Sequence, residues 1–141
     1  MGEPSVAAEV SVPPGNRLLI LETDAQFASQ VAELARSLGI AAVIAANQEE
    51  FESQYQAFQP SMLSLDVVLG RQDVFATIEF LGHRRATEPL FLVSGYDHRL
   101  VDAVASAAMD FGLLVADRIP KGPEALRRLS RQFKAYSLET E

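Results

Sequence analysis

The 141-residue sequence contains no cysteine and no tryptophan. Without cysteine, these residues can form no disulfide, no thiolate metal site and no thiol nucleophile, and the absence is consistent with a reducing compartment. No apolar run approaches the roughly 20 residues that a membrane-spanning helix needs. The first residues carry acids where a signal peptide needs bases. We therefore expect a cytoplasmic protein without a membrane partner.

Cations are also scarce. The chain has 12 Lys and Arg against 19 Asp and Glu, which gives a formal net charge of -7. This balance argues against non-specific binding to nucleic acid, because a polyanion is repelled by a surface of the same sign. Apolar residues make up 48% of the chain, and its length suffices for one substantial hydrophobic core.

The chain divides into three expected parts. Residues 1–15, which end in Pro-Pro-Gly, are typical of a flexible tail. Residues 16–136 form the predicted domain, and residues 137–141 form a C-terminal tail or the stub of a linker. Within the domain, five apolar runs are typical of buried strands: 17–21, 40–46, 61–65, 89–94 and 113–119.

Amphipathic helical segments separate these runs. Their apolar residues recur at spacings of three and four, which is one face of a helix: Phe27, Val31, Leu34 and Leu38; Phe51, Tyr55 and Phe58; Val74, Ile78 and Leu81; Leu100, Val104, Ala107 and Phe111; Leu126, Leu129, Phe133 and Tyr136. Strict alternation with nearly all-apolar strands predicts an α/β fold, a five-stranded parallel sheet with helices on both faces. Right-handed crossovers favour the strand order 2-1-3-4-5.

Polar residues gather where the predicted strands end. In such a sheet, ligands bind beyond the carboxyl ends of the strands, and the residues there are Glu22, Thr23, Asp24, Asp66, Ser94, Gly95 and Lys121. A carboxylate can carry a covalent phosphoryl group, and neighbouring carboxylates can hold Mg²⁺. A hydroxyl and a lysine can bind phosphoryl oxygens, and Gly95 leaves room beside Ser94. The set fits a phosphoryl-transfer site.

In the stretches "LLILETD", "SLDVVLGRQD", "LFLVSGYD" and "RIPKGPEAL", the sequence resembles the receiver domain of bacterial two-component response regulators, the CheY-like fold, over residues 16–136. The resemblance implies that Asp66 accepts a phosphoryl group from a histidine kinase or phosphotransfer protein. It also implies that Glu22 and Asp66 bind Mg²⁺, that Ser94 senses the phosphoryl group and that Lys121 contacts it. The implied role is signalling to an effector protein or fused output domain, without enzymatic activity; receivers often form homodimers.

Some positions depart from the family pattern. Counting back from Gly39 puts Thr23 where the family has a second acid, so Mg²⁺ binding is in question; a one-residue slip would let Asp24 take that place. Counting forward from Gly112 puts Lys121 at the lysine position. Counting from the following "PEAL" instead puts Ile119 there and leaves no lysine.

The family's aromatic residue in the fifth strand is replaced by Arg118 or Ala116, depending on the alignment. These departures favour an alternative, a pseudo-receiver that acts as a phosphorylation-independent interaction or dimerisation module.

Two enzyme-like classes fit less well. A flavodoxin wants a Ser/Thr/Gly-rich loop after the first strand, and a haloacid-dehalogenase-like phosphatase wants Asp-x-Asp, where this chain has Glu-x-Asp.

The last predicted helix is basic. Arg127, Arg128 and Arg131 lie on it together with Lys134. Such a run is most simply a solvated face, but it could serve as a surface for a protein partner, or for a cyclic dinucleotide.

Overall fold

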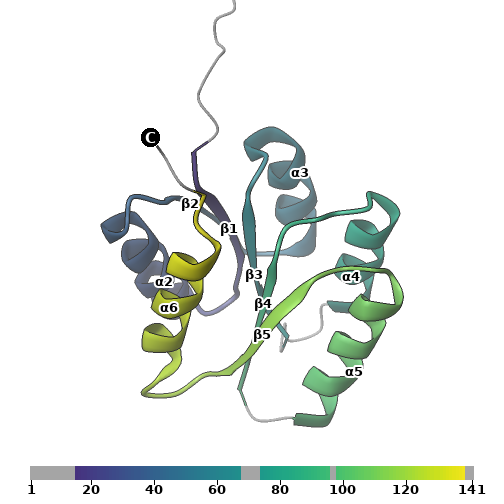
Figure 1. The fold of residues 1–141 in the computed structure, drawn as a ribbon. Coiled ribbons are helices and arrows are strands. Elements are labelled where there is room, and N and C mark those ends of the chain that lie inside the picture. Colours follow the sequence, from purple (N-terminus) through teal and green to yellow (C-terminus); the bar gives the residue numbers. More distant parts are fainter. Residues whose placement is uncertain (1–14, 68–73, 96–97, 139–141) are drawn as a thin grey trace, which may run out of the picture.

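The computed structural model describes residues 15–67, 74–95 and 98–138, and these form a sheet between two layers of helices (Figure 1). The strands are β1 (Arg17–Leu21), β2 (Ala41–Ala45), β3 (Met62–Asp66), β4 (Leu90–Ser94) and β5 (Val115–Pro120). The helices are α2 (Ala25–Ser37), α3 (Gln48–Phe58), α4 (Val74–His83), α5 (His98–Asp110) and α6 (Ala125–Tyr136). Apart from residue 15, the expected N-terminal tail lies outside the described residues, as do residues 139–141.

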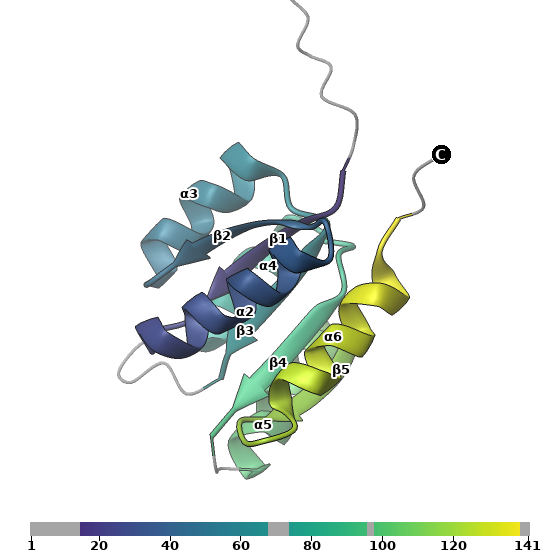
Figure 2. The same ribbon diagram turned by 90° about the vertical axis from the view of Figure 1, so that its left-hand side faces the viewer.

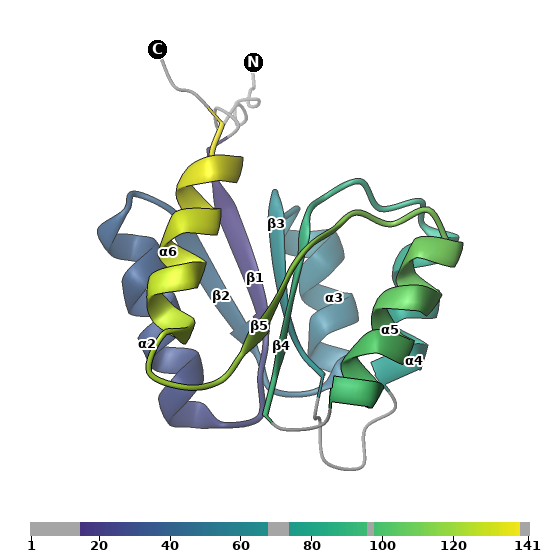
Figure 3. The same cartoon turned by 60° about the horizontal axis from the view of Figure 1, so that its bottom comes forward.

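The sheet has the predicted topology. All neighbouring strands pair in parallel, in the order β2-β1-β3-β4-β5. Helices α2 and α6 cover one face, and α3, α4 and α5 cover the other, so the sheet is the middle of three layers (Figures 2 and 3). Each face has its own cluster of buried apolar side chains. The β3 and β4 strands are buried along their whole length, as expected for central strands of a parallel sheet.

Local signals set the helix ends. The Asp24 side chain accepts hydrogen bonds from the backbone N–H groups of Gln26 and Phe27 at the start of α2. Asn47 accepts one from the N–H of Glu50 at the start of α3 and so caps that helix. After α2, Gly39 adopts a φ of 80°, a conformation that costs glycine little because it has no Cβ.

The two ends of the domain are joined at the amino edge of the sheet. The side-chain amide of Asn16 accepts a hydrogen bond from the N–H of Leu138 and donates one to its carbonyl, at 2.6 and 3.3 Å. Ordered contacts therefore extend two residues beyond the predicted domain limit at residue 136. Among the described residues, no helix combines the length and the apolar character needed to cross a membrane.

Candidate phosphoryl-acceptor site at the carboxyl edge

Four side chains named from the sequence meet at the carboxyl edge of the sheet, the lower edge in Figure 1. Glu22 directly follows β1, Asp66 is the last residue of β3, Ser94 is the last residue of β4, and Lys121 directly follows β5. These strands are neighbours in the order β1-β3-β4-β5, so their ends converge. Glu22, Asp66 and Ser94 are nearly inaccessible, with 3%, 1% and 6% of their surface exposed.

Lys121 contacts the other three residues of the site. Its Nζ donates a hydrogen bond to Oε2 of Glu22 at 2.7 Å and lies 3.6 Å from Oδ2 of Asp66. Its backbone N–H donates to the carbonyl of Ser94 at 2.6 Å. The ammonium also lies 5.1 Å from the centre of the Phe27 ring, a cation–π arrangement. The contribution of Phe27 was not predicted, because its spacing on α2 marks it only as a core residue.

An irregularity in β5 explains why Lys121, and not Ile119, occupies the site. Leu90 pairs with Val115 but Phe91 pairs with Asp117, so Ala116 is an extra residue in the strand. A bulge of one residue shifts every later side chain to the opposite face. Consequently Ile119 enters the core at 1% exposure, and the next residues reach the edge of the sheet beside Ser94.

The electrostatics of the site are dominated by two buried carboxylates that share one ammonium. Burial raises the pKa of Glu22 to about 7, since removal from water and the nearby Asp66 carboxylate outweigh the attraction of Lys121. Burial by itself would lower the pKa of Lys121, but the hydrogen bond with Glu22 and the surrounding carboxylates raise it. Lys121 therefore stays charged, and Glu22 is the group that gains a proton as the pH falls through 7.

The residues that follow Glu22 have separate roles. Oγ1 of Thr23 donates a long hydrogen bond to Oδ2 of Asp66 at 3.4 Å. The Asp24 carboxylate caps α2, and its backbone N–H donates to Oε2 of Glu22 at 3.1 Å. Thr23 therefore brings a hydroxyl toward Asp66, while the acid one residue later, Asp24, stabilises a helix.

Open space adjoins Ser94. A Cβ added to Gly95 would meet no heavy atom within 4 Å from the described part of the chain, its chain neighbours aside, so the backbone leaves room there. A small cavity of about 80 Å³ lies on the α5 side of Ser94; it is lined by Ser94, His98, Val101, Asp102, Arg118 and Pro120. At its wall, Nη1 of Arg118 contacts Oδ1 of Asp102 at 2.8 Å. Sequence patterns gave no signal for this ion pair.

The donor set suits a hard cation only in part. Within the described ranges, no group of three or more His, Asp or Glu side chains is arranged to hold a metal ion. Glu22 and Asp66 nevertheless present two buried carboxylates, both in contact with the Lys121 ammonium. Oxygen ligands of this kind are those that Mg²⁺ accepts, together with water. Glu22 and Asp66 thus fit a Mg²⁺ site with one protein carboxylate fewer than the family pattern.

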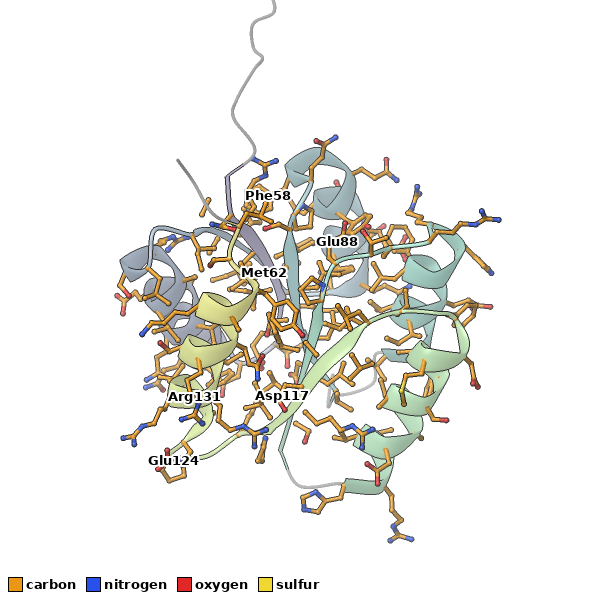
Figure 4. All side chains as sticks on the ribbon, viewed as in Figure 1. Phe58, Met62, Glu88, Asp117, Glu124 and Arg131 are labelled. Atoms are coloured by element: carbon orange, nitrogen blue, oxygen red, sulfur yellow. The ribbon has the colours of Figure 1, made fainter. Side chains whose placement is uncertain are left out.

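The basic residues of α6 differ in their surroundings. Nη2 of Arg128 contacts Oδ1 of Asp117 at 2.6 Å, and Gln132 donates to the other oxygen of the same carboxylate at 3.0 Å. Figure 4 shows Asp117 on β5 beside α6. Arg128 thus attaches α6 to the sheet, whereas Arg127 and Arg131 are exposed.

No protein-family model matches the sequence, and no curated protein matches it. Solved structures do match. A CheY-like response regulator receiver domain protein from Methanospirillum hungatei JF-1 superimposes with a TM-score of 0.73 at 19% identity, over 86% of this chain and 93% of that one. The chain has the receiver-domain fold. A putative response regulator from Chloroflexus aurantiacus J-10-fl gives a TM-score of 0.67 at 22% identity, over 87% of this chain and 98% of that one.

NtrX from Brucella abortus matches with a TM-score of 0.73 at 16% identity, over 87% of this chain but only 26% of that one. The receiver fold therefore occurs both as nearly a whole chain and as one part of a longer chain. The predicted CheY-like fold is confirmed. The fold alone does not assign a function, so the function has to be argued from the side chains at the carboxyl edge of the sheet.

Proposed function

We propose that this chain is a signalling receiver that accepts a phosphoryl group on Asp66 and transmits a conformational change to a partner. The observation that carries the proposal is the position of the Asp66 carboxylate, 3.6 Å from the Lys121 ammonium at an edge shared with Glu22 and Ser94. A buried carboxylate beside a cation has the chemistry of a nucleophile whose transferred group is stabilised by charge.

In the transfer, an Oδ atom of Asp66 attacks the phosphorus of a phosphorylated donor. The new O–P bond forms as the bond from phosphorus to the donor breaks, and the donor leaves with the electron pair: imidazole from a phosphohistidine, or acetate from acetyl phosphate. Lys121 would meet a phosphoryl oxygen as a point charge, the Ser94 hydroxyl would donate to another, and Gly95 leaves space for the group.

Glu22 and Asp66 are the residues that would hold Mg²⁺, and a bound Mg²⁺ would neutralise charge on the transferring group. The Thr23 hydroxyl supplies no negative charge, so we expect weaker binding than at a site with three carboxylates. Titration of Mg²⁺ into ¹⁵N-labelled protein, with amide shifts of residues 21–24 and 64–67 as readout, tests this without phosphorylation. Saturable shifts that disappear in Glu22→Gln support the metal site, and a flat response refutes it.

The partners follow from this role. The donor would be a histidine kinase or phosphotransfer protein of a cytoplasmic two-component pathway, and the recipient an effector protein or a fused output domain. Residues 16–136 would be the receiver unit, which could also form a homodimer. Of the basic residues on α6, Arg127 and Arg131 are available to a partner, since Arg128 is held by Asp117.

Intact mass spectrometry tests the phosphorylation directly. After incubation with acetyl phosphate and Mg²⁺, the wild type should gain the mass of one phosphoryl group, and Asp66→Asn should gain none. Asp110→Asn, a change of the same chemistry at the end of α5, should gain mass like the wild type. Wild-type protein that stays unmodified under every metal condition refutes the proposal.

A second candidate, the phosphorylation-independent pseudo-receiver, is favoured by one observation. Lys121 already bridges both carboxylates, and Asp66 is only 1% exposed, so the site is closed around its own charges. This candidate predicts neither a mass gain nor a Mg²⁺ response, and an Asp66→Asn variant that keeps all partner binding.

A further inference from the structure

A larger cavity lies at the amino edge of the sheet, at the opposite end from Asp66. Its volume is about 440 Å³, within the range of roughly 300–1,000 Å³ that is usual for sites of small molecules. It is lined by residues from the end of α3 and from the segment between α4 and β4: Tyr55, Gln56, Gln59, Pro60, Arg84 and Glu88. Figure 4 shows Glu88 between α3 and α4.

Contacts between side chains hold the walls of this cavity in place. The Tyr55 ring packs edge-on against Phe80, with the ring centres 5.8 Å apart, and its hydroxyl donates a hydrogen bond to Oε1 of Glu88 at 2.8 Å. The Arg84 guanidinium lies 4.5 Å from the centre of the Phe80 ring, a cation–π arrangement. One aromatic ring therefore supports both Tyr55 and Arg84, and a site fixed in this way loses little freedom when a ligand binds.

The backbone on two sides of the cavity adopts an uncommon conformation. Among the described residues, Gln59 and Arg85 are the only ones other than glycine with a positive φ, 53° and 56°. Gln59 lines the cavity, and Arg85 directly follows Arg84. The Gln59 carbonyl accepts a hydrogen bond from Nε of Arg17 at 3.0 Å, which helps to hold this conformation. Residues with such backbone angles are often found at functional sites, because the surrounding structure has to maintain them.

Opposite charges face the cavity without neutralising one another. Burial and the Glu88 carboxylate raise the pKa of Tyr55, while Arg84 lowers it, so both charges lie near the Tyr55 hydroxyl. In the part of the chain that the structure describes, no ion pair joins Arg84 to Glu88 or either of them to another side chain. The cavity therefore offers a cation and an anion that one ligand could contact together.

We propose that this cavity binds a free α-amino acid with an apolar side chain. Its carboxylate would accept hydrogen bonds from the Arg84 guanidinium, which can present two parallel N–H donors, and its ammonium would donate to Glu88. The apolar side chain would pack against the Tyr55 ring and Pro60. A ligand with a single charge would match only one of the two charged residues, so the zwitterion is favoured.

This inference goes beyond the proposed function and does not require Asp66 to be modified. Pro60 lies two residues before β3, and Asp66 is the last residue of that strand. The amino acid would therefore bind at one end of the strand that carries the phosphoryl acceptor at its other end.

The test compares three probes: L-phenylalanine, 3-phenylpropionate, which lacks the ammonium, and 2-phenylethylamine, which lacks the carboxylate. Each is titrated into ¹⁵N-labelled protein, with the amide signals of residues 55–59 and 84–88 as readout. The cavity variants are Arg84→Gln and Glu88→Gln; the second keeps an oxygen that can accept from Tyr55. The matched controls are Arg131→Gln and Glu79→Gln, which change exposed residues that do not line the cavity.

In the wild type and both controls, L-phenylalanine should give saturable shifts with a Kd of about a millimolar, as expected for a ligand of this size. The other two probes should bind about fivefold more weakly, the loss that one exposed charge pair implies. L-phenylalanine should bind Arg84→Gln no better than 2-phenylethylamine does, and Glu88→Gln no better than 3-phenylpropionate does.

Three results would overturn the inference: no saturable shift in the wild type, equal binding of the three probes, or unchanged L-phenylalanine binding in both cavity variants. Asp66→Asn should bind L-phenylalanine like the wild type. Failure of the phosphorylation test therefore leaves this inference standing, and failure of the titration leaves the proposed function standing.

Discussion

The ammonium of Lys121 hydrogen-bonds the carboxylate of Glu22 at 2.7 Å, although the two residues are 99 positions apart in the chain. This contact closes the carboxyl edge of the sheet, because it ties the residue after β5 to the residue after β1. It also sets the charge state of the site, since Lys121 is the cation that faces both buried carboxylates.

Loss of the Lys121 ammonium should destabilise the fold. In Lys121→Met, two buried carboxylates lose the ammonium that contacts them. We expect a cost of about 1–3 kcal/mol in the free energy of unfolding, below the value for fully buried pairs because Lys121 is partly exposed. Urea unfolding at pH 7.5 measures it. Lys134→Met removes the exposed lysine of α6 and should change stability by less than about 0.5 kcal/mol. Equal effects of the two substitutions would show that the ion pair contributes nothing.

The raised pKa of Glu22, about 7, predicts a particular pH dependence of stability. Its unfolded-state value is 4.5, so between pH 4.5 and 7 the folded protein binds more protons than the unfolded chain, and stability falls as the pH rises. The difference between the two pKa values corresponds to roughly 3 kcal/mol in the free energy of unfolding, and this contribution disappears as the pH rises through 7 toward 8. The free energies of unfolding of the wild type and Glu22→Gln can be measured from pH 4.5 to 8. The wild-type value should fall relative to that of Glu22→Gln as the pH rises through this range. A difference independent of pH would contradict the assignment.

The sheet order and most helix faces could be predicted because they depend on local signals. Apolar runs, three-four spacing and caps such as Asp24 and Asn47 lie within a few residues of the structure they determine. Phe111 was expected on the inner face of the fourth helix. Instead α5 ends at Asp110, and Phe111, 41% exposed, contacts Gly82 of α4.

The least predictable feature was the bulge in β5. The sequence left Lys121 and Ile119 as alternatives because the extra residue at Ala116 has no local signature; it is visible only in the pairing of β5 with β4. The same bulge decides that Arg118 faces α5 and that Asp117 faces α6. Contacts of this kind depend on which face a strand presents, and a slip of one residue inverts them.

The buried hydroxyl of Thr77 should lower the stability of the fold. Thr77 on α4 is fully buried, and its hydroxyl has no hydrogen-bond partner among the residues that the structure describes. Thr77→Val keeps the shape and removes the unsatisfied group, so we expect a gain of about 1 kcal/mol. Thr77→Ser keeps the hydroxyl and removes a methyl group, and should lose about 1 kcal/mol. Thermal and urea unfolding of Thr77→Val and Thr77→Ser measure these changes in stability. A Thr77→Val variant less stable than the wild type would mean that the hydroxyl has a hydrogen-bond partner.

Gly82, near the end of α4, should resist substitution because of Phe111. A Cβ at Gly82 would lie 2.3 Å from Cδ1 and 2.9 Å from Cβ of Phe111, so the ring and its backbone attachment would both have to move. We expect Gly82→Ala to destabilise the protein by about 1–2 kcal/mol through overpacking, even though alanine is the better helix former.

A double-mutant cycle separates these two effects of Gly82→Ala. In a Phe111→Ala background the steric conflict is gone, and the same substitution should stabilise the protein by up to about 1 kcal/mol through helix propensity alone. The reversal of sign is the diagnostic result, because a backbone requirement for glycine would persist in both backgrounds, and Gly82 has no positive φ that would impose one. Destabilisation of the same size with and without the ring would mean that the contact between Gly82 and Phe111 is not its cause.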